Sequence, residues 1–151
     1  MAKRIEISLP ENRLNIGTLK VLDEDGNQLL ADIECRGKAD NQRAAKRGNP
    51  LRHSTYPYGD TPSGEYAPTK CVVFREEIER FGIGWIPMEG ISGDAHLAKD
   101  NGRTGLAIHG GRGNERLVPT FGCVRVRDID FRHMAHVLGD DDIAISIKDT
   151  F

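Results

Sequence analysis

The sequence lacks the features that mark disulfide scaffolds and membrane proteins. Its 151 residues include only three cysteines, Cys35, Cys71 and Cys123. Disulfide-stapled domains are much richer in cysteine, so that class is excluded, and the odd count leaves at least one thiol free. No uninterrupted apolar run approaches the roughly 20 residues that a membrane-spanning helix needs. We therefore expect no membrane insertion.

A large charge of one sign is also lacking. The 21 lysines and arginines nearly balance 23 aspartates and glutamates, for a formal net charge of −2. A nearly neutral chain has no general attraction for nucleic acid or anionic lipid, so we expect no nucleic-acid partner. The length and the 38% apolar content suit one folded unit with its own core. We interpret residues 1–151 as a single domain.

No secretory signal peptide is visible at the N-terminus. Lys3 and Arg4 are followed by Glu6 and Pro10, which interrupt the apolar segment that a leader requires. Three explanations stay open. The protein stays in the cytoplasm, the sequence has lost its leader, or the protein is exported by a route that reads no leader.

The hydrophobic pattern predicts a mainly β fold with many tight turns, in keeping with 17 glycines. Alternating or β-branched apolar residues predict strands at residues 5–8, 19–22, 29–35, 71–74, 106–108, 123–126 and 143–147. Asp25 and Gly26 form a hairpin-turn signal. We expect the strand at 71–74 to be buried and residues 76–80 to form a short helical turn.

One notable helix is predicted over residues 128–138. Asp128 or Asp130 is the expected N-cap, and Gly139 lies just past the helix end. The expected apolar stripe of this helix consists of Ile129, Met134, Val137 and Leu138. One helix and many strands together indicate packed sheets.

Reactive residue types occur together near the C-terminal half of the chain. His109 ends one predicted strand, and Cys123 begins another fourteen positions later. A free thiol is only a few per cent thiolate at pH 7, and a nearby imidazole raises its reactivity. Gly122 permits close approach of a substrate, and the amides of Gly122 and Cys123 are candidate oxyanion donors. Arg125 shares a strand face with Cys123 and is a candidate clamp for a carboxylate.

Other interpretations of these residues stay open. A lone cysteine in a strand is more often a small buried apolar residue, and a lone histidine is more often a satisfied polar one. His133 and His136 could complete a zinc site with His109 and Cys123, but they lie on the predicted helix and no Cys-x-x-Cys pair anchors them. We expect no metal. The glycines after His109 lack the Lys-Ser/Thr of a phosphate-binding loop.

The order of three motifs resembles the L,D-transpeptidase catalytic domain (the YkuD-type family). The motifs are residues 61–66 (Thr-Pro-Ser-Gly-Glu-Tyr), the pair His109-Gly110, and residues 120–125 (Thr-Phe-Gly-Cys-Val-Arg). The likeness covers most of the chain, because the opening strands and the closing helix and strand also fit. The chain departs from the family pattern at Phe121, where many members have histidine, and in a short loop between the histidine and the cysteine.

The resemblance implies a peptidoglycan enzyme on a β-sandwich with one notable C-terminal helix. It would cut a stem tetrapeptide between its third residue, an L-centre of a diamino acid, and its fourth, a D-residue. Cys123 would form the thioester, His109 would act as base, and the carbonyl of Gly110 would orient the imidazole. An amine acceptor would then give a cross-link or an exchanged D-amino acid, and water would give carboxypeptidase action. No cofactor is implied, and the site of action would be the cell envelope or periplasm.

The resemblance gives three further residues a place in the site. Thr120, Gly122 and Arg125 are predicted to contact the substrate, although bracing of the loop is nearly as strong an alternative for Arg125 and a stronger one for Thr120. The resemblance leaves open the acceptor and the oligomeric state. Whether Cys35 and Cys71 pair is equally open.

Two alternatives of function remain. One is a wall-binding module whose site has decayed at Phe121. The other is an antibacterial effector of the same chemistry, because residues 102–105 ahead of His109 resemble effectors delivered by type VI secretion. Residues 37–58 form a long polar excursion made basic by Arg43, Lys46, Arg47 and Arg52. This segment is either a solvated loop or a contact for an anionic wall polymer.

Overall fold

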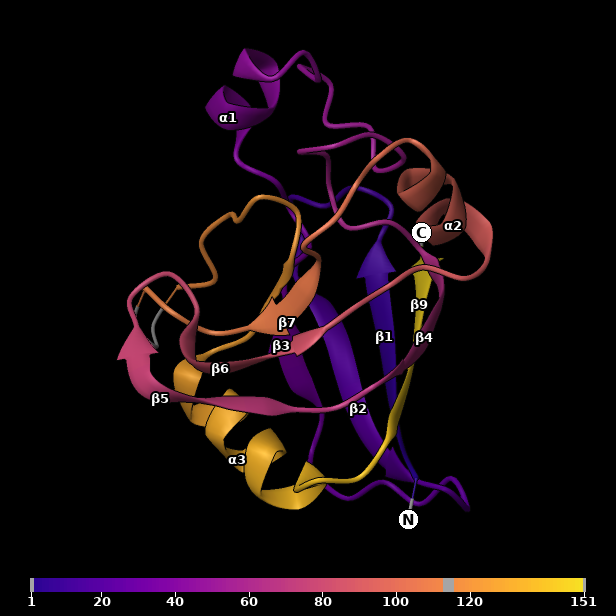
Figure 1. The fold of residues 1–151 in the computed structure, drawn as a ribbon, viewed down its shortest axis with the longest axis vertical. Coiled ribbons are helices and arrows are strands. Elements are labelled where there is room, and N and C mark those ends of the chain that lie inside the picture. Colours follow the sequence, from indigo (N-terminus) through magenta and orange to yellow (C-terminus); the bar gives the residue numbers. More distant parts are fainter. Residues whose placement is uncertain (1, 113–115, 151) are drawn as a thin grey trace.

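The fold is seen in a computed structural model that describes residues 2–112 and 116–150 (Figure 1). Within these residues lie nine strands and three helices. They are β1 (Lys3–Pro10), β2 (Gly17–Asp23), β3 (Ile33–Cys35), α1 (Asn41–Lys46), β4 (Gly64–Thr69), β5 (Val72–Ile78), β6 (Gly82–Pro87), α2 (Gly93–Asp100), β7 (Ala107–His109), β8 (Val124–Arg125), α3 (Asp128–Leu138) and β9 (Ile143–Thr150). The protein is mainly β, as the sequence predicts.

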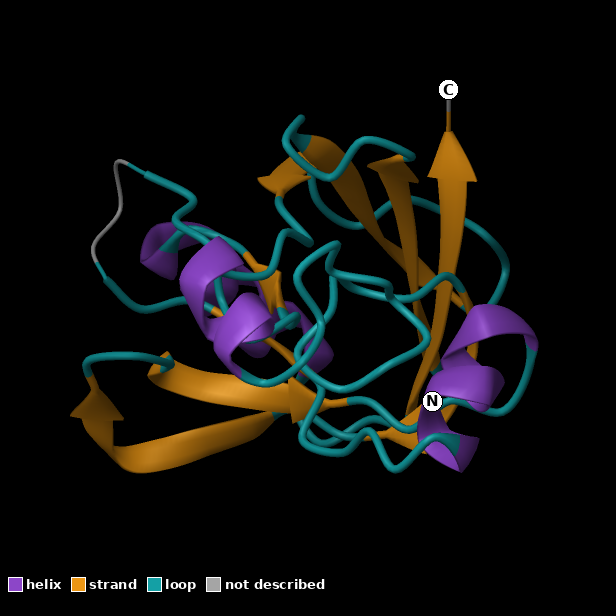
Figure 2. Cartoon of the chain, turned by 90° about the horizontal axis from the view of Figure 1, so that it is seen from above, coloured by secondary structure: helices purple, strands orange, loops and turns teal. Residues whose placement is uncertain are grey.

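The strands form two mixed sheets. The first has the order β3-β2-β1-β9-β4, in which only β1 and β9 run parallel. The second has the order β5-β6-β7-β8, in which β7 and β8 are the parallel pair. Figure 2 shows the strands in two groups with helices at the flanks and loops between them. The parallel pair in the second sheet is what brings two distant motifs together.

The core lies between the sheets and α3, and its residues alternate along the strands as expected for one buried face. β1 buries Ile5, Ile7 and Leu9, and its parallel neighbour β9 buries three isoleucines on the same side. The helix α3 contributes Phe131 and Met134, both fully buried. In Figure 1, α3 lies at the lower left, beside the second sheet, while α1 stands apart at the top.

The prediction for α3 is confirmed at the C-terminal end of the helix and is wrong about its N-cap. The helix spans Asp128–Leu138, and Gly139 ends it with a φ of 52°, as the sequence predicts. The predicted aspartate caps are wrong, because Arg127 is the N-cap residue and Asp128 accepts the Gly111 amide instead. Ile129 does not belong to the apolar stripe, since it is 48% exposed while Phe131 takes its place in the core.

Three predictions in the first eighty residues are wrong. The strand at 71–74 is part of β5, an edge strand, and Val73 is 61% exposed rather than buried. Residues 76–80 continue β5 to Ile78 and then turn, so they form no helical turn. The strand at 29–35 is shortened to β3, because only its last three residues pair with β2. All three outcomes depend on which strands pair with each other, and a local sequence pattern does not contain that information.

The sequence did not predict the helices α1 and α2. α1 begins at its N-cap Asp40, whose side chain accepts the Arg43 amide. α2 buries Ala95 and Ala98 against the rest of the molecule, while its one larger apolar side chain, Leu97, is exposed. Short helices with small buried residues give little apolar periodicity, so the pattern that predicts longer helices misses them.

Residues 113–115, which belong to the short loop expected between His109 and Cys123, lie outside the described part of the chain. None of the helices within it is long and apolar enough to cross a membrane.

Candidate active site

The register of β7 and β8 brings His109 and Cys123 to one face of the second sheet. His109 ends β7 opposite Arg125, and Cys123 lies immediately before β8, two residues ahead of Arg125. Successive side chains in a strand alternate between faces, so Cys123, Arg125 and His109 point to the same side. Diagonal neighbours on paired strands lie within reach of a ring or a long side chain. The register therefore brings the two reactive groups to one side of the sheet, where both line the same cavity, although fourteen positions separate them.

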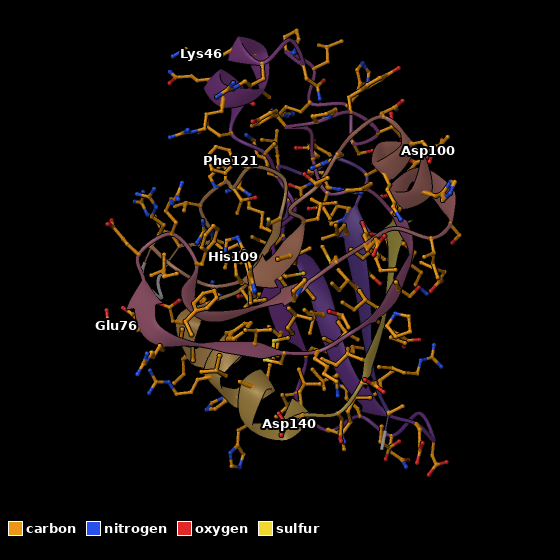
Figure 3. The ribbon with its side chains drawn as sticks, in the orientation of Figure 1. Lys46, Glu76, Asp100, His109, Phe121 and Asp140 are labelled. Atoms are coloured by element: carbon orange, nitrogen blue, oxygen red, sulfur yellow. The ribbon has the colours of Figure 1, made fainter. Side chains whose placement is uncertain are left out.

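Two contacts of the imidazole and one backbone pairing fix His109. Its Nδ1 lies 2.7 Å from the carbonyl oxygen of Gly110, the contact that the family resemblance implies. The ring of Phe81 packs edge-on against it at 4.9 Å between centroids, and β6 pairs Trp85 with His109. A carbonyl only accepts, so Nδ1 carries the proton and Nε2 is left as a proton acceptor. Figure 3 shows His109 beside β7, below Phe121.

Burial keeps both reactive groups neutral at rest. The pKa of His109 is lowered to about 4, chiefly by burial and further by the charge of Arg125, which together outweigh the raising effects of the Gly110 carbonyl and of Asp128. Burial raises the pKa of the Cys123 thiol, while a hydrogen bond from the Ala107 backbone opposes that rise. The resting pair is therefore a thiol and an unprotonated imidazole. This arrangement suits a general base that removes the thiol proton during attack.

Two cavities open from Cys123. One, of about 570 Å³, is lined by His109, Cys123 and Arg125 together with Phe81. The other, of about 680 Å³, is lined by Cys123 and by α1. Cys123 is 6% exposed and is part of both linings, so its sulfur lies where the two cavities meet.

The turn before Cys123 is held by hydroxyl groups. Thr120 Oγ1 accepts the Gly122 amide at 2.9 Å and donates to the Cys123 carbonyl at 2.9 Å. Thr61 Oγ1 donates to the Gly122 carbonyl at 2.6 Å, so the 61–66 motif supports the cysteine turn directly. Because Thr120 uses the Gly122 amide, the Cys123 amide is the better candidate for an oxyanion donor. Substrate contact by Thr120 stays a prediction.

Gly122 is required by space as well as by conformation. Its φ is +110°, and an added Cβ would lie 1.9 Å from Nη2 of Arg103 and 2.2 Å from the Gly59 carbonyl. Arg103 is 5% exposed and donates to the carbonyls of Ser54, Gly59 and Asp60 at 2.5–2.7 Å. It thereby ties the long 37–58 excursion and the residues after it to the site. Sequence reasoning missed this role, because nothing local distinguishes an arginine that will be buried.

Arg125 lies in the site but most of its guanidinium is engaged by the backbone. Its Nη1 donates to the carbonyls of Gly110 and Gly111 at 2.7 and 2.9 Å, and its Nε donates to Val118 at 2.8 Å. The Gly110 carbonyl therefore joins Arg125 to the imidazole of His109. These contacts make Arg125 a positioning residue, and its predicted clamp on a substrate carboxylate stays untested.

Replacing Thr61 with valine is expected to loosen the cysteine turn. The side chain is fully buried, so valine fits while the Gly122 carbonyl loses its donor. An unsatisfied buried carbonyl costs about 1–3 kcal/mol. Urea unfolding should show this loss, and Thr18→Val on the outer face of β2 should leave the unfolding free energy nearly unchanged. Equal stability of both variants would contradict the role of the Thr61 hydroxyl.

Burial of His109 predicts a loss of stability in mild acid. Its pKa is about 4 in the folded protein against 6.5 in the unfolded chain, so the unfolded chain binds more protons between these values. The free energy of unfolding should fall by about 3 kcal/mol as the pH drops from 6.5 to 4. His109→Gln should lack this component, which unfolding curves of both proteins across that range will measure. Parallel pH dependences would contradict the burial of a neutral imidazole.

The remaining sequence hypotheses concern metal and disulfides. In residues 2–112 and 116–150, no group of three or more His, Cys, Asp or Glu side chains is placed to hold a metal ion. All three cysteines are free, with Cys35 in the core and Cys71 half-buried. The zinc alternative thus has no cluster to support it among the described residues.

Comparisons with known proteins bear on the fold. No protein-family model matches this chain, and neither does the sequence of any curated protein. A crystal structure of the helical cell shape determining protein Pgp2 from Campylobacter jejuni superimposes with a TM-score of 0.60 at 16% identity. The match covers 99% of this chain and 49% of Pgp2. This chain has the fold of about half of Pgp2.

Two further solved structures agree. A variant of Pgp2 gives a TM-score of 0.61 at 16% identity, covering 99% of this chain and 48% of the variant. Bd1075 of Bdellovibrio bacteriovorus gives 0.55 at 18% identity, covering 97% of this chain and 47% of Bd1075. The chain therefore spans about half the length of the structures it matches. At these identities the likeness is one of fold.

Proposed function

We propose that this chain is a cysteine L,D-transpeptidase or L,D-carboxypeptidase that acts on the stem peptides of peptidoglycan. One observation carries the proposal: His109 and Cys123 face one cavity from paired strand ends, with Nδ1 of His109 held by the Gly110 carbonyl. Two further points support the substrate class. The ordered motifs resemble the YkuD-type family, and the fold is shared with a protein that determines cell shape.

The first half of the reaction uses the neutral pair. Nε2 of His109 removes the thiol proton of Cys123 while the sulfur attacks the carbonyl carbon of the L-centre residue, and a C–S bond forms. The Cys123 amide is placed to donate to the oxyanion. When the tetrahedral intermediate collapses, the C–N bond breaks and the imidazolium returns the proton to the leaving amine of the D-residue. A thioester on Cys123 remains.

The second half runs the same steps with a new nucleophile. An amine attacks the thioester carbonyl, His109 accepts its proton, and the thiolate leaves and is reprotonated. A stem-peptide amine gives a cross-link, a free D-amino acid gives exchange, and water gives a shortened peptide. The residues of this chain supply the nucleophile, the base and the oxyanion donor, and the reaction as written involves no cofactor. The proposal places this activity in the cell envelope.

Product analysis tests the proposal. The protein is incubated with a defined muropeptide that carries a tetrapeptide, with and without an added D-amino acid, and the products are weighed by mass spectrometry. We expect loss of the terminal D-residue in water, and its replacement when the D-amino acid is present. An unchanged muropeptide under both conditions, with bound protein detected on peptidoglycan, would favour a wall-binding module without chemistry.

A further inference from the structure

The larger cavity beside Cys123 is lined by positively charged side chains. We name it the basic arm and define it by four cations in its lining, which come from α1, from the residue after α1 and from the segment before β7. They are Arg43, Lys46, Arg47 and Arg103. Among its lining residues, all of which lie in the described part of the chain, there is no aspartate or glutamate. In Figure 3, Lys46 lies on α1 at the top of the molecule, above the site.

Three of these cations are not neutralised by carboxylates. Arg43, Lys46 and Arg47 are exposed, and in the described residues none of them forms an ion pair. Elsewhere in the molecule an exposed arginine does pair, as Arg4 does with Glu6 at 3.2 Å. Arg103 is different, because it is buried and its donors are spent on backbone carbonyls. The basic arm therefore presents three charges without a carboxylate partner among the described residues, in a cavity that Cys123 also lines.

Aromatic rings hold two of these cations in place. The guanidinium of Arg43 lies 4.6 Å from the centre of the Phe121 ring, and that of Arg47 lies 5.2 Å from the centre of the Tyr58 ring. The two rings pack edge-to-face at 6.2 Å. Tyr58 adopts a φ of 65°, a strained conformation for a non-glycine residue. A cation stacked on a ring keeps its N–H groups free for a ligand.

We propose that the basic arm binds the free C-terminal carboxylate of the peptide that is cut, through Lys46 and Arg47, with Arg43 at its inner end. The inference rests on the proposed function, since that reaction places the residue beyond the scissile bond next to Cys123. That residue carries the terminal carboxylate, and the arm begins at Cys123. Charge-assisted bonds to a carboxylate are the strong ones in proteins. The arm thus selects unamidated, unblocked peptide ends.

Charge reversal on α1 tests the inference in turnover. The double variant Lys46→Glu/Arg47→Glu changes two exposed side chains, so the fold should persist. Its matched control is Arg132→Glu/Lys148→Glu, which makes the same change in net charge on α3 and β9. With a free-acid tetrapeptide we expect KM to rise tenfold or more and kcat to stay within about twofold. With the C-terminal amide of that peptide, KM should be high for the wild type and should not rise further in the double variant.

A binding measurement separates this inference from the proposed function. The Cys123→Ala protein is titrated with N-succinyl-D-alanine and with its C-terminal amide, each at low and high salt. We expect the free acid to bind tighter, by a margin that shrinks with salt and vanishes in the α1 double variant. Such binding without any turnover would uphold the basic arm and reject the enzyme. Equal KM values for acid and amide in an active enzyme, or equal binding of the two probes, would overturn the basic arm.

Discussion

Replacing Cys123 with alanine is expected to abolish the release of the D-residue and every transfer product. In the proposed reaction the sulfur forms the covalent intermediate. Among the described residues that line both cavities, the other three are Arg43, Gly105 and Phe121, and none of them has a nucleophilic side chain. The change should leave the fold intact, because alanine is smaller and removes two contacts, the 3.5 Å contact of the thiol with the Gly105 carbonyl and its hydrogen bond with the Ala107 backbone. We expect the free energy of unfolding to change by no more than about 1 kcal/mol.

The matched control for this variant is Cys71→Ala. Cys71 is half-buried and lies outside both cavities at the site. Chromatography of the products should show normal turnover for Cys71→Ala and none for Cys123→Ala, with both proteins folded by circular dichroism. Residual turnover in a folded Cys123→Ala protein would contradict the assignment of the nucleophile.

Replacing His109 with alanine is expected to slow thioester formation by about two to four orders of magnitude. The thiol of Cys123 is buried and its pKa is raised, so at neutral pH it cannot attack without a base. His109→Ala removes that base while Gly110 and Arg125 keep their mutual contact. Single-turnover kinetics with a tetrapeptide will measure the loss, and His96→Ala on the exposed face of α2 is the control.

The pH dependence of the same rate separates base catalysis from a packing role. His109 has a pKa of about 4, so the imidazole is unprotonated throughout the neutral range. The acylation rate of the wild type should therefore stay level down to about pH 5 and fall as the pH passes through about 4. In His109→Ala this acid limb should disappear. An acid limb centred near 6.5 would mean that the imidazole is not buried as the structure has it.

Local patterns predicted the parts of the fold that depend on local forces. The alternation of Ile143, Ile145 and Ile147 gave β9, because one face of that strand is buried and the other is not. Gly139 predicted the C-terminal end of α3, and in the structure it ends the helix with a positive φ. The family resemblance predicted the contact between His109 and the Gly110 carbonyl, which belong to neighbouring residues of the chain.

Long-range contacts account for what the sequence did not predict. Val72 and Val73 are apolar, yet the edge position of β5 leaves them exposed. Arg103 looks like any surface cation until the fold supplies three carbonyls for it. The basic segment was noted as a solvated loop or a contact for an anionic polymer, and only the packing of α1 beside Cys123 shows that its charges line a cavity.

The structure shows what Phe121 contacts at the position where many members of the resembled family have histidine. Phe121 is part of the lining of both cavities, and it stacks with Arg43 on one side and Tyr58 on the other. A histidine at this position would add a polar group to the site. Phenylalanine instead provides an apolar surface that holds the cation of Arg43 near the sulfur.

The proposed proton transfer from Cys123 to His109 is tested most directly by trapping the covalent intermediate that it would produce. The protein is mixed with a tetrapeptide, quenched in acid within one turnover, and weighed intact before proteolysis locates the adduct. The account predicts a mass increase equal to the acyl tripeptide, carried by the peptide that contains Cys123, and a large reduction of that signal in His109→Ala. An adduct on Cys71 or Cys35, or an unmodified protein while product accumulates, would contradict it.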